Sequence, residues 1–358
     1  MAGKKLCKVC GVPKRVTREH EWIGNGTIVQ RENREHRMVF IETENLAATF
    51  SGVEEIIGRS VERIIIEAKR RATFDFVDHM LPGAVKAVLR IVGMRPAINS
   101  ISTLGSIMGY GDIALVKLHR SRLFAHDFAI VNIKEPYSIA LFCGDLAGTF
   151  NAVNRREVGA TYRQISEIEY EVTGHVSTHP IGLKDRLQTK KYASKEGDIQ
   201  WEACPKCGGP LALSKYQWHI DRGIIEGKEY ARRMALLGPA ALDAIIDELE
   251  SELGDSIPHV VVEAQRRFAR TGFYTLEEIA SEELFREQLA IRGLGNLKEV
   301  EWGNESMSFR MENPCLHLVI VGLVQGFFEL AFGREGAVEW DLTSDGDLSV
   351  EVSVKKDS

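Results

Sequence analysis

Two short stretches decide how this chain is organised: Cys7-Lys8-Val9-Cys10-Gly11-Val12-Pro13 and Cys204-Pro205-Lys206-Cys207-Gly208-Gly209-Pro210. Both follow the pattern C-x-x-C-G-x-P, and each stands at the beginning of one half of the sequence. A C-x-x-C loop presents two thiolates to one soft metal ion, and the glycine and proline shape the tight turn around it. The two stretches therefore predict a duplicated chain whose halves meet at one shared metal ion.

The composition is that of a globular protein with a substantial core. The chain has 358 residues, of which 44% are hydrophobic and 27% charged, and this length is typical of two domains. The formal net charge of −6 does not favour a broad nucleic-acid-binding surface, which is usually basic. A zinc-ribbon-like nucleic-acid binder would use the lysines and arginines around Cys7, which we interpret instead as a solvated face.

Cysteine usage and hydropathy indicate where the protein works. Six cysteines in a chain of this length are too sparse for a secreted disulfide scaffold, and the N-terminus lacks the apolar segment of a secretory signal. The longest apolar run, Cys315–Phe332, contains His317, Gln325 and Glu329, so we expect no membrane span. The sequence predicts a cytoplasmic protein in a reducing compartment.

The two halves can be aligned over their full length. Gly58–Arg71 and Gly254–Arg267 match without a gap, and both read G-x-S, then three β-branched residues, then E-A-x-R-R. Gly109-Tyr110-Gly111 falls over Gly293-Leu294-Gly295. The order is kept to the end by four further matches: Pro136 with Pro314, Gly144 with Gly322, Gly148 with Gly326, and Phe150 with Phe328. This order predicts a tandem duplication with a pseudo-twofold arrangement.

The repeats set the predicted domain boundaries. The first repeat covers residues 1–173 and the second covers residues 201–358, each beginning with its C-x-x-C knuckle. The polar stretch at 174–200 is predicted to be the linker between them.

Each repeat predicts helices packed on antiparallel strands, an α+β fold. Asn25-Gly26 between apolar residues is typical of a hairpin, and the apolar spacing predicts one long helix from Leu46 to His79. Its counterpart, Pro239–Thr271, is expected to break near Ser256 because Pro258 lies inside the pattern. The predicted elements after each Gly-x-Gly turn are a strand pair, an apolar helix and closing strands: 113–133, 137–151 and 160–172 in the first half, and 297–311, 315–332 and 337–354 in the second.

The four knuckle cysteines, Cys7, Cys10, Cys204 and Cys207, predict one zinc site, because four thiolates suit Zn²⁺ in a tetrahedral structural site. Four alternatives remain at this point: separate reduced cysteines, a metal shared with His20 or His219, an iron–sulfur cluster on the same four sulfurs, and a thioredoxin-like redox pair, which is less favoured because Cys7 sits near the terminus.

The apolar helices that carry Gly-x-x-x-Gly predict either close packing or space for a ligand. A buried cysteine in a helix is usually inert, so each residue taken singly fits a core position equally well. As a group, the predicted ligand-binding residues are Cys143, Gly144, Gly148, Cys315, His317, Gly322 and Gly326.

The second half resembles the 4-vinyl reductase domain family. The resemblance covers most of residues 230–354 and, more faintly, residues 40–172. It rests on Gly293-Leu294-Gly295, Asn313-Pro314-Cys315, Gly322-Leu323-Val324-Gln325-Gly326, Val338-Glu339 and Asp345-Gly346-Asp347. The resemblance implies an α+β domain with an apolar cavity for a hydrophobic or tetrapyrrole-like ligand. The closing strands lack the cysteines that the family often carries there, and the two knuckles stand outside the usual domain.

The function expected from these features is binding or sensing of a hydrophobic small molecule by a zinc-stabilised protein without an output domain of its own. A signal would then pass to a partner protein. The alternative is an enzyme or accessory factor acting on an unsaturated or tetrapyrrole-like substrate. We expect a binding protein rather than an enzyme, because the sequence has no flavin, nicotinamide or nucleophile motif.

Overall fold

The computed structural model describes residues 5–80, 83, 95–119, 126–154, 156–177, 191–192 and 194–355. Residues 178–190 and 193 of the predicted linker lie outside this described part. The fold is α+β, with helices packed on antiparallel sheets, as the sequence predicts.

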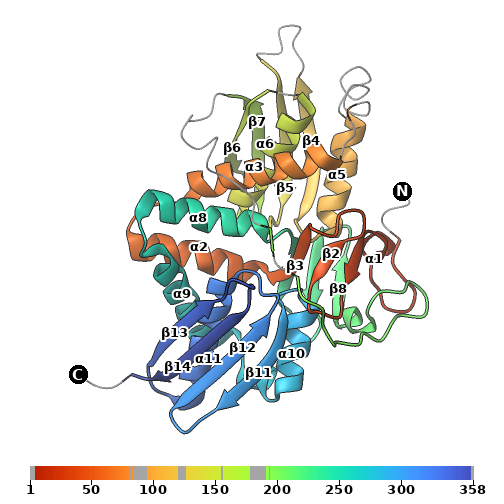
Figure 1. Ribbon diagram of the computed structural model, residues 1–358. Coiled ribbons are helices and arrows are strands. Elements are labelled where there is room, and N and C mark those ends of the chain that lie inside the picture. The colour runs from red at the N-terminus through yellow and green to blue at the C-terminus, as the bar shows by residue number, and fades with distance from the viewer. Residues whose placement is uncertain are drawn as a thin grey trace.

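Helices and strands alternate in a similar order in the two halves (Figure 1). The helices are α1 (Lys14–Glu19), α2 (Thr43–Ile57), α3 (Glu62–Met80), α5 (Arg95–Ile107), α6 (Ile139–Asn154), α8 (Ala240–Leu253), α9 (Ile257–Phe268), α10 (Glu282–Ile291) and α11 (His317–Phe332), with short turns η2 (Leu211–Lys215), η3 (Ala269–Phe273) and η4 (Leu276–Ile279). The strands are β1 (His20–Trp22), β2 (Ile28–Gln30), β3 (Arg37–Glu42), β4 (Asp112–His119), β5 (Phe128–Lys134), β6 (Val158–Gln164), β7 (Glu169–Val176), β8 (Tyr216–His219), β9 (Ile224–Gly227), β10 (Arg233–Leu237), β11 (Asn296–Trp302), β12 (Ser306–Glu312), β13 (Gly336–Leu342) and β14 (Leu348–Val354).

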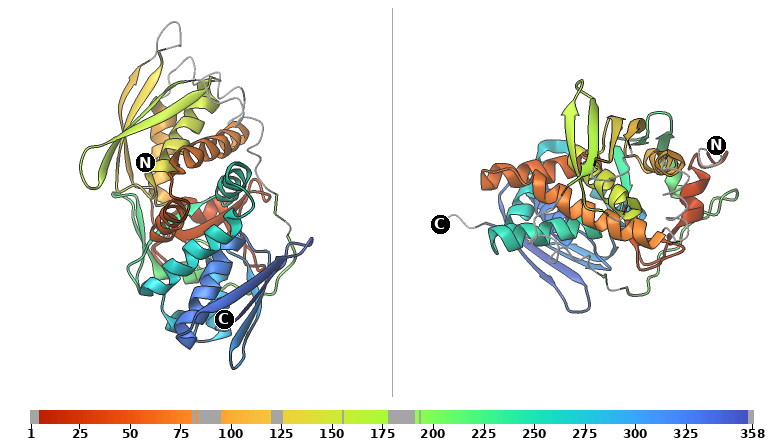
Figure 2. Two further views of the ribbon diagram at one scale, coloured as in Figure 1. Left: turned by 90° about the vertical axis from the view of Figure 1, so that its left-hand side faces the viewer. Right: turned by 90° about the horizontal axis from the view of Figure 1, so that it is seen from above.

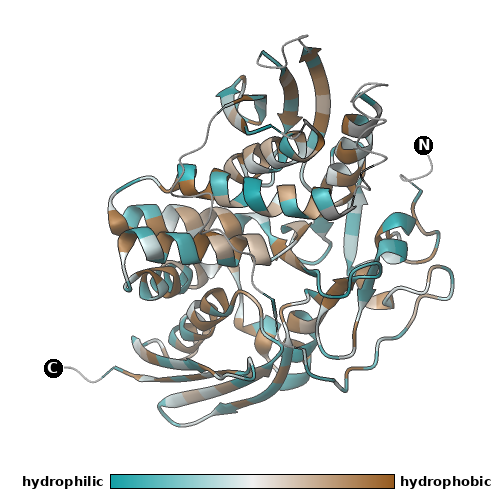
Figure 3. Cartoon of the chain, turned by 45° about the horizontal axis from the view of Figure 1, so that its top comes forward, coloured by the Kyte–Doolittle hydropathy of each residue, from teal (hydrophilic) through white to brown (hydrophobic). Residues whose placement is uncertain are grey.

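Two four-stranded sheets have the same antiparallel strand order. One runs β4-β5-β7-β6 and the other β11-β12-β14-β13, and each first hairpin carries a register shift, at Leu115/Lys117 and at Leu297/Glu299. The two sheets lie at opposite ends of the molecule, with helices between them (Figures 1 and 2). Along β14, buried residues alternate with exposed or half-buried ones, and along β13 exposed residues alternate with half-buried ones after Gly336. Bands of opposite hydropathy mark the strands near the C-terminus (Figure 3). The strand pairs predicted at 113–133 and 297–311 are therefore confirmed.

The third sheet joins the two halves. Its order is β1-β2-β3-β10-β9-β8, so the strands of the first half and those of the second meet at the β3–β10 pair. Phe40 stands opposite Leu236 in that pair. The predicted Asn25-Gly26 hairpin is confirmed as the connection between β1 and β2.

The hairpin of each half packs on the other half. The indole N–H of Trp22 donates to the carbonyl of Ile291 at 2.9 Å, and that of Trp218 donates to the carbonyl of Ile107 at 3.1 Å. The helices also pack across the two halves, since α2 packs on α9 and α8 packs on α3. The two halves are therefore joined by packing as well as by the chain.

Two arginines also form hydrogen bonds from one half to the other. The buried guanidinium of Arg37 donates to the carbonyls of Gly293, Asn313 and Pro314, all in the second half. Arg233 makes the reciprocal bonds to the carbonyls of the first half, those of Gly109, Glu135 and Pro136.

The single helix predicted from Leu46 to His79 is wrong. The helix ends at Ile57, and a second one, α3, begins at Glu62. Gly58 at the C-cap has a φ of 73°, and its N–H bonds to the carbonyl of Glu54, so the glycine ends the first helix in a left-handed turn. The break expected near Ser256 is confirmed, since α8 ends at Leu253 and α9 begins at Ile257.

One apolar core extends through both halves. Its largest cluster of buried side chains includes Leu141 on α6, Ile245 on α8 and Phe328 on α11. Among the residues that the structure describes, every helix is too short or too polar to cross a lipid bilayer.

Candidate functional site

The two C-x-x-C stretches form the same backbone turn. In the first, the N–H of Cys7 donates to the carbonyl of Val12 at 2.8 Å, and the N–H of Gly11 donates to the carbonyl of Cys7 at 3.0 Å. In the second, Cys204 bonds to Gly209 at 2.7 Å, and Gly208 bonds to Cys204 at 2.9 Å. Gly11 and Gly208 have φ values of 76° and 75°, a conformation that favours glycine.

The four cysteines converge on one point although the knuckles are about two hundred residues apart in sequence. The Sγ atoms of Cys7 and Cys204 are 3.8 Å apart, those of Cys10 and Cys207 are 3.5 Å apart, and all four sulfurs lie within 4.8 Å of one another. A disulfide would bring two sulfurs to about 2 Å, so the thiols are free.

The sulfur geometry fits a tetrahedral metal site. Zinc–sulfur bonds of about 2.3 Å in a tetrahedron put the sulfurs about 3.8 Å apart. The two sulfur pairs, at 3.8 and 3.5 Å, are close to that spacing. These four cysteines could therefore bind one metal ion, as the sequence predicts.

The backbone around the cluster favours thiolates at two of its positions. The pKa of the Cys204 thiol is lowered to about 6, and the main cause is the hydrogen bond that the backbone N–H of Lys206 donates to its sulfur. The pKa of Cys7 is also below its ordinary value, because amide donors outweigh the effect of burial. Burial raises the pKa of Cys10 and that of Cys207. A metal ion would have to displace the protons of these two thiols, so its binding would release protons.

A cavity of about 540 Å³ lies in the first half. It is bordered by α3, α5, α6 and the tip of the β2–β3 hairpin, and residues 191–192 and the beginning of α8 also line it. Much of its wall is apolar, including Phe76, Ile98, Ile101 and Phe142. This volume is in the range of small-molecule sites.

One wall of the cavity carries a buried polar cluster centred on Asp145. The carboxylate of Asp145 accepts from the hydroxyl of Thr73 at 2.8 Å and from that of Tyr137 at 2.6 Å, and it pairs with the ammonium of Lys69 at 3.2 Å. The side chains of Lys69 and Asp145 are 8% and 16% exposed, so the ion pair is largely removed from water. Burial, followed by the charge of Asp145, raises the pKa of Tyr137 well above its ordinary value.

His36 adds a neutral ring to the same cavity. It stacks on Phe76 with ring centroids 5.0 Å apart. Burial first, and then the positive charge of Lys69, lowers the pKa of His36 to about 4. His36 is therefore uncharged at neutral pH.

The structure places none of the seven residues predicted to bind a ligand in the wall of this cavity. Three of them lie on α6, one of its bordering helices, and the other four lie in or next to α11 in the second half. Gly144 and Gly148 let α6 approach α3: a Cβ at Gly148 would lie 2.4 Å from the carbonyl oxygen of Arg70. Gly322 and Gly326 do the same for α11 on α9, where a Cβ at Gly326 would lie 2.3 Å from the Cβ of Ala269. The other three are the buried Cys143 and Cys315 and the half-buried His317. A direct contact of any of the seven with a ligand stays a prediction.

Sequence reasoning missed the polar residues of the cavity. Asp145 follows Gly144 in a mostly apolar helix, and it is the single acidic residue there that could have indicated a polar site. Lys69 belongs to the repeated E-A-x-R-R stretch, where the charges were readily interpreted as solvated. Lys69 and Asp145 are 76 positions apart, so their pairing has no local signal in the sequence.

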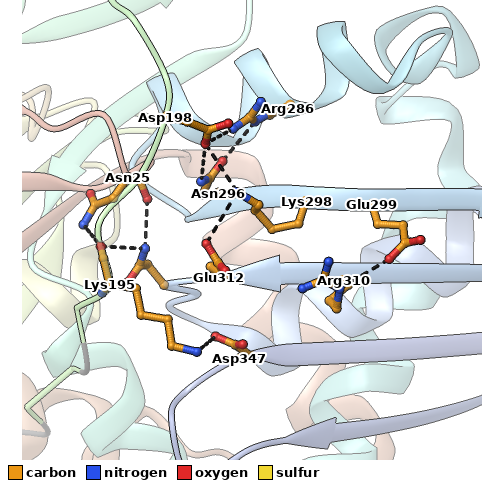
Figure 4. A network of polar contacts seen from close by, with 11 residues as sticks. Asn25, Lys195, Asp198, Arg286, Asn296, Lys298, Glu299, Arg310, Glu312 and Asp347 are labelled. Carbon is orange, nitrogen blue, oxygen red and sulfur yellow. Dashed lines mark hydrogen bonds and ion pairs between the residues drawn. The ribbon is translucent and has the colours of Figure 1, made fainter.

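The end of the predicted linker binds both halves (Figure 4). The carbonyl of Lys195 accepts from Asn25 at 2.8 Å, and the ammonium of Lys195 pairs with Asp347 at 2.7 Å. Asp198 accepts from Asn296 and pairs with Arg286, and the bond from Asn296 is the largest contribution to a pKa of about 2 for Asp198. Residues 194–198 thus hold the first hairpin against the second half.

Comparisons with known proteins give only distant similarity. No protein-family model matches the sequence, and no curated protein matches it. The phenol-responsive sensory domain of the transcription activator PoxR, solved with phenol, is 11% identical with a TM-score of 0.35, covering 45% of this chain and 87% of that domain. A Cs H-NOX mutant with 4-cyano-L-phenylalanine at site 5 is 14% identical with a TM-score of 0.26, covering 34% of this chain and 75% of that one. Another H-NOX structure, solved to probe the function of heme distortion, is 15% identical with a TM-score of 0.24, covering 32% of this chain and 71% of that one. These scores are too low to indicate what this chain binds.

Proposed function

We propose that this chain is a small-molecule-binding protein whose ligand occupies the cavity of the first half. The observation that carries the proposal is the cavity itself, about 540 Å³, with an apolar wall and the polar cluster of Lys69, Thr73, Tyr137 and Asp145 on one side. An apolar body with a polar group at one end would match both surfaces. Binding or sensing of a hydrophobic compound, with the signal passed to a partner protein in the cytoplasm, is the proposed role.

The proposed architecture is a tandem duplication of a domain similar to the 4-vinyl reductase family. We assign the repeats to residues 1–173 and 201–358, with the linker at 174–200. The equal strand order of the two outer sheets and the reciprocal hydrogen bonds of Trp22 and Trp218 support a pseudo-twofold arrangement. Phe40 and Leu236 stand opposite each other in the central sheet, where the axis would pass.

The proposed cofactor is one zinc ion held by Cys7, Cys10, Cys204 and Cys207. The sulfur spacing and the matched knuckle turns support it. Each half would supply two ligands, so the ion would stabilise the contact between the halves. This role is structural, because four protein ligands leave no open coordination position.

The metal proposal is tested by substitution in both knuckles. Metal analysis of the purified chain should give one zinc per chain, and Cys7→Ser or Cys204→Ser should each lower that value to near zero. Cys143→Ser is the matched control, because Cys143 is buried in α6 away from the cluster and should leave the zinc content unchanged. Two zinc ions per chain, or retention of zinc by both knuckle variants, would show that the halves do not share one ion.

The ligand proposal is tested by native mass spectrometry of the protein before and after extraction with organic solvent. A co-purified apolar compound, or uptake of a neutral apolar probe such as N-phenyl-1-naphthylamine, is the expected result. A folded protein that takes up neither would refute the proposal. A purified protein that carries a coloured redox cofactor would instead favour the enzymatic alternative.

A further inference from the structure

The second half has a counterpart of the cavity, and it is much smaller. It lies between the β8–β10 strands, α10 and α11, which match β1–β3, α5 and α6, and its volume is about 90 Å³, compared with about 540 Å³ in the first half. Two differences contribute. The α3 helix lines the first cavity as far as Val77, whereas α9 ends at Phe268 and Tyr274 and Glu278 line the second space instead. The side chains on the matching strands and helices also differ.

Hydrogen bonds fix which residues of α5 and α10 correspond. The N–H of Tyr110 donates to the carbonyl of Gly105 at 2.9 Å, and the N–H of Leu294 donates to that of Leu289 at 3.0 Å. Counting back from these bonds, Phe285 of α10 takes the place of Ile101 in α5.

The same comparison can be made for α6 and α11. Phe150 and Phe328 are both fully buried at matching places, and the glycines two residues earlier both pack on the preceding helix. Thr149, one residue before Phe150, therefore corresponds to Phe327. Both members of this pair line the cavity of their own half.

Aromatic rings fill the space in the second half. The rings of Phe285 and Phe327 have centroids 6.0 Å apart in an edge-to-face arrangement, and Tyr274 meets Phe327 at 5.8 Å in the same way. In the first half the corresponding space is bordered by Ile101 and Thr149, which have no ring.

Arg232 occupies the remaining part of the second cavity. It precedes Arg233 as His36 precedes Arg37, and both Arg232 and His36 line the cavity of their half. The guanidinium of Arg232 lies 4.7 Å from the ring centroid of Phe273 and 4.8 Å from that of Tyr274.

A carboxylate completes the surroundings of this guanidinium. Glu278 takes two bonds from Arg232, one of them at 2.7 Å, and the side chain of Arg232 is only 10% exposed. Cation–π contacts and a bidentate carboxylate together stabilise the guanidinium of Arg232 in this position, so a ligand would not easily displace it. The side chain of Arg232 thus occupies space in the second cavity that a ligand would need.

We infer that the chain binds one ligand, in the first half only, because Arg232, Phe285 and Phe327 fill the equivalent cavity of the second half. This inference rests on the proposed function. It assigns the two halves different roles: the first half binds the ligand, and the second half binds none and provides the surface on which the β1–β2 hairpin of the first half packs.

The test is a titration with N-phenyl-1-naphthylamine, with stoichiometry read by fluorescence and by native mass spectrometry. The wild-type chain should bind one probe molecule. Thr149→Phe and Ile101→Phe, which introduce the second half's residues into the first cavity, should each weaken binding at least tenfold. Thr161→Phe makes the same substitution as the first at an exposed position of β6 and should leave binding unchanged. The triple variant Arg232→His, Phe285→Ile and Phe327→Thr, which gives the second half the residues of the first, should bind two probe molecules.

The outcomes separate this inference from the proposed function. No binding by the wild-type chain would refute both. Two probe molecules bound by the wild-type chain would overturn the inference and leave the proposed function standing. Unchanged binding by Thr149→Phe and Ile101→Phe, in proteins with wild-type circular dichroism spectra, would show that the ligand lies elsewhere. A folded triple variant that still binds one molecule would show that these three side chains do not close the second cavity.

Discussion

Replacing Asp145 by asparagine should destabilise the first half strongly, because it leaves a buried ammonium without its counter-ion. The carboxylate of Asp145 lies 3.2 Å from the ammonium of Lys69, and the side chain of Lys69 is 8% exposed. Asparagine keeps the size of the side chain, and its one amide oxygen can accept from one of the two hydroxyls, while its NH2 group can donate to the other. The substitution therefore removes the charge and reverses one hydrogen bond.

The expected cost follows from the burial of the pair. Removing one partner of a buried ion pair costs about 3–5 kcal/mol. Because Asp145 is itself 16% exposed, we expect the lower end, about 3 kcal/mol, roughly a hundredfold change in the unfolding equilibrium. Lys69→Met added to Asp145→Asn should restore about 2 kcal/mol, since the unpaired charge is then gone.

Urea denaturation followed by circular dichroism measures these differences. The control is Glu171→Gln, which breaks the Arg163–Glu171 pair, joined at 3.1 Å but with the arginine 71% exposed. That change should cost less than about 1 kcal/mol, because exposed pairs contribute little. A cost for Asp145→Asn as small as that of the control, or no recovery in the double variant, would refute the reasoning.

Two further predictions concern pH and backbone contact. Because the pKa of His36 is lowered to about 4 from 6.5, the unfolded chain takes up a proton that the folded chain does not between these values. Wild-type stability should therefore fall relative to His36→Phe as the pH drops from 6.5 to 4, by up to about tenfold in the unfolding equilibrium per pH unit; a constant difference in urea midpoint would contradict this. Gly26→Ala should cost about 3 kcal/mol or more, since its φ is +77° and a Cβ would lie 2.2 Å from the carbonyl oxygen of Gly295. Gly58→Ala, at a φ of +73° with open space around it, should cost only about 1–2 kcal/mol; equal costs in thermal or urea unfolding would count against the contact.

Local signals were enough to predict most of the elements. Asn25-Gly26 predicts its hairpin because the turn needs positive φ, and Gly26 has a φ of 77°. The break between α8 and α9 was predicted because a proline lies inside the helical pattern. Gly58 gave a weaker signal, because a lone glycine inside an apolar helical pattern is often tolerated there.

The contacts between the halves had no comparable signal. Arg37 bonds to a carbonyl 277 residues away, and Trp22 to one 269 residues away. Sequence similarity between the halves predicts that they are alike, but it does not say whether each hairpin packs on its own half or on the other. That choice depends on the whole core and is made only when all the apolar faces are buried together.

The sequence by itself determined the α+β class, the strand hairpins and the two C-x-x-C knuckle turns, because turns, periodicity and ligand spacing within a knuckle are short-range properties. The tertiary structure decided that four sulfurs lie within 4.8 Å, that Lys69 meets Asp145, and that the cavity of the first half is about 540 Å³ while its counterpart in the second half is about 90 Å³. The physical reason is that a cavity is the volume left when distant helices pack. Single exchanges, such as Thr149 for Phe327, change that volume while leaving the helical pattern intact.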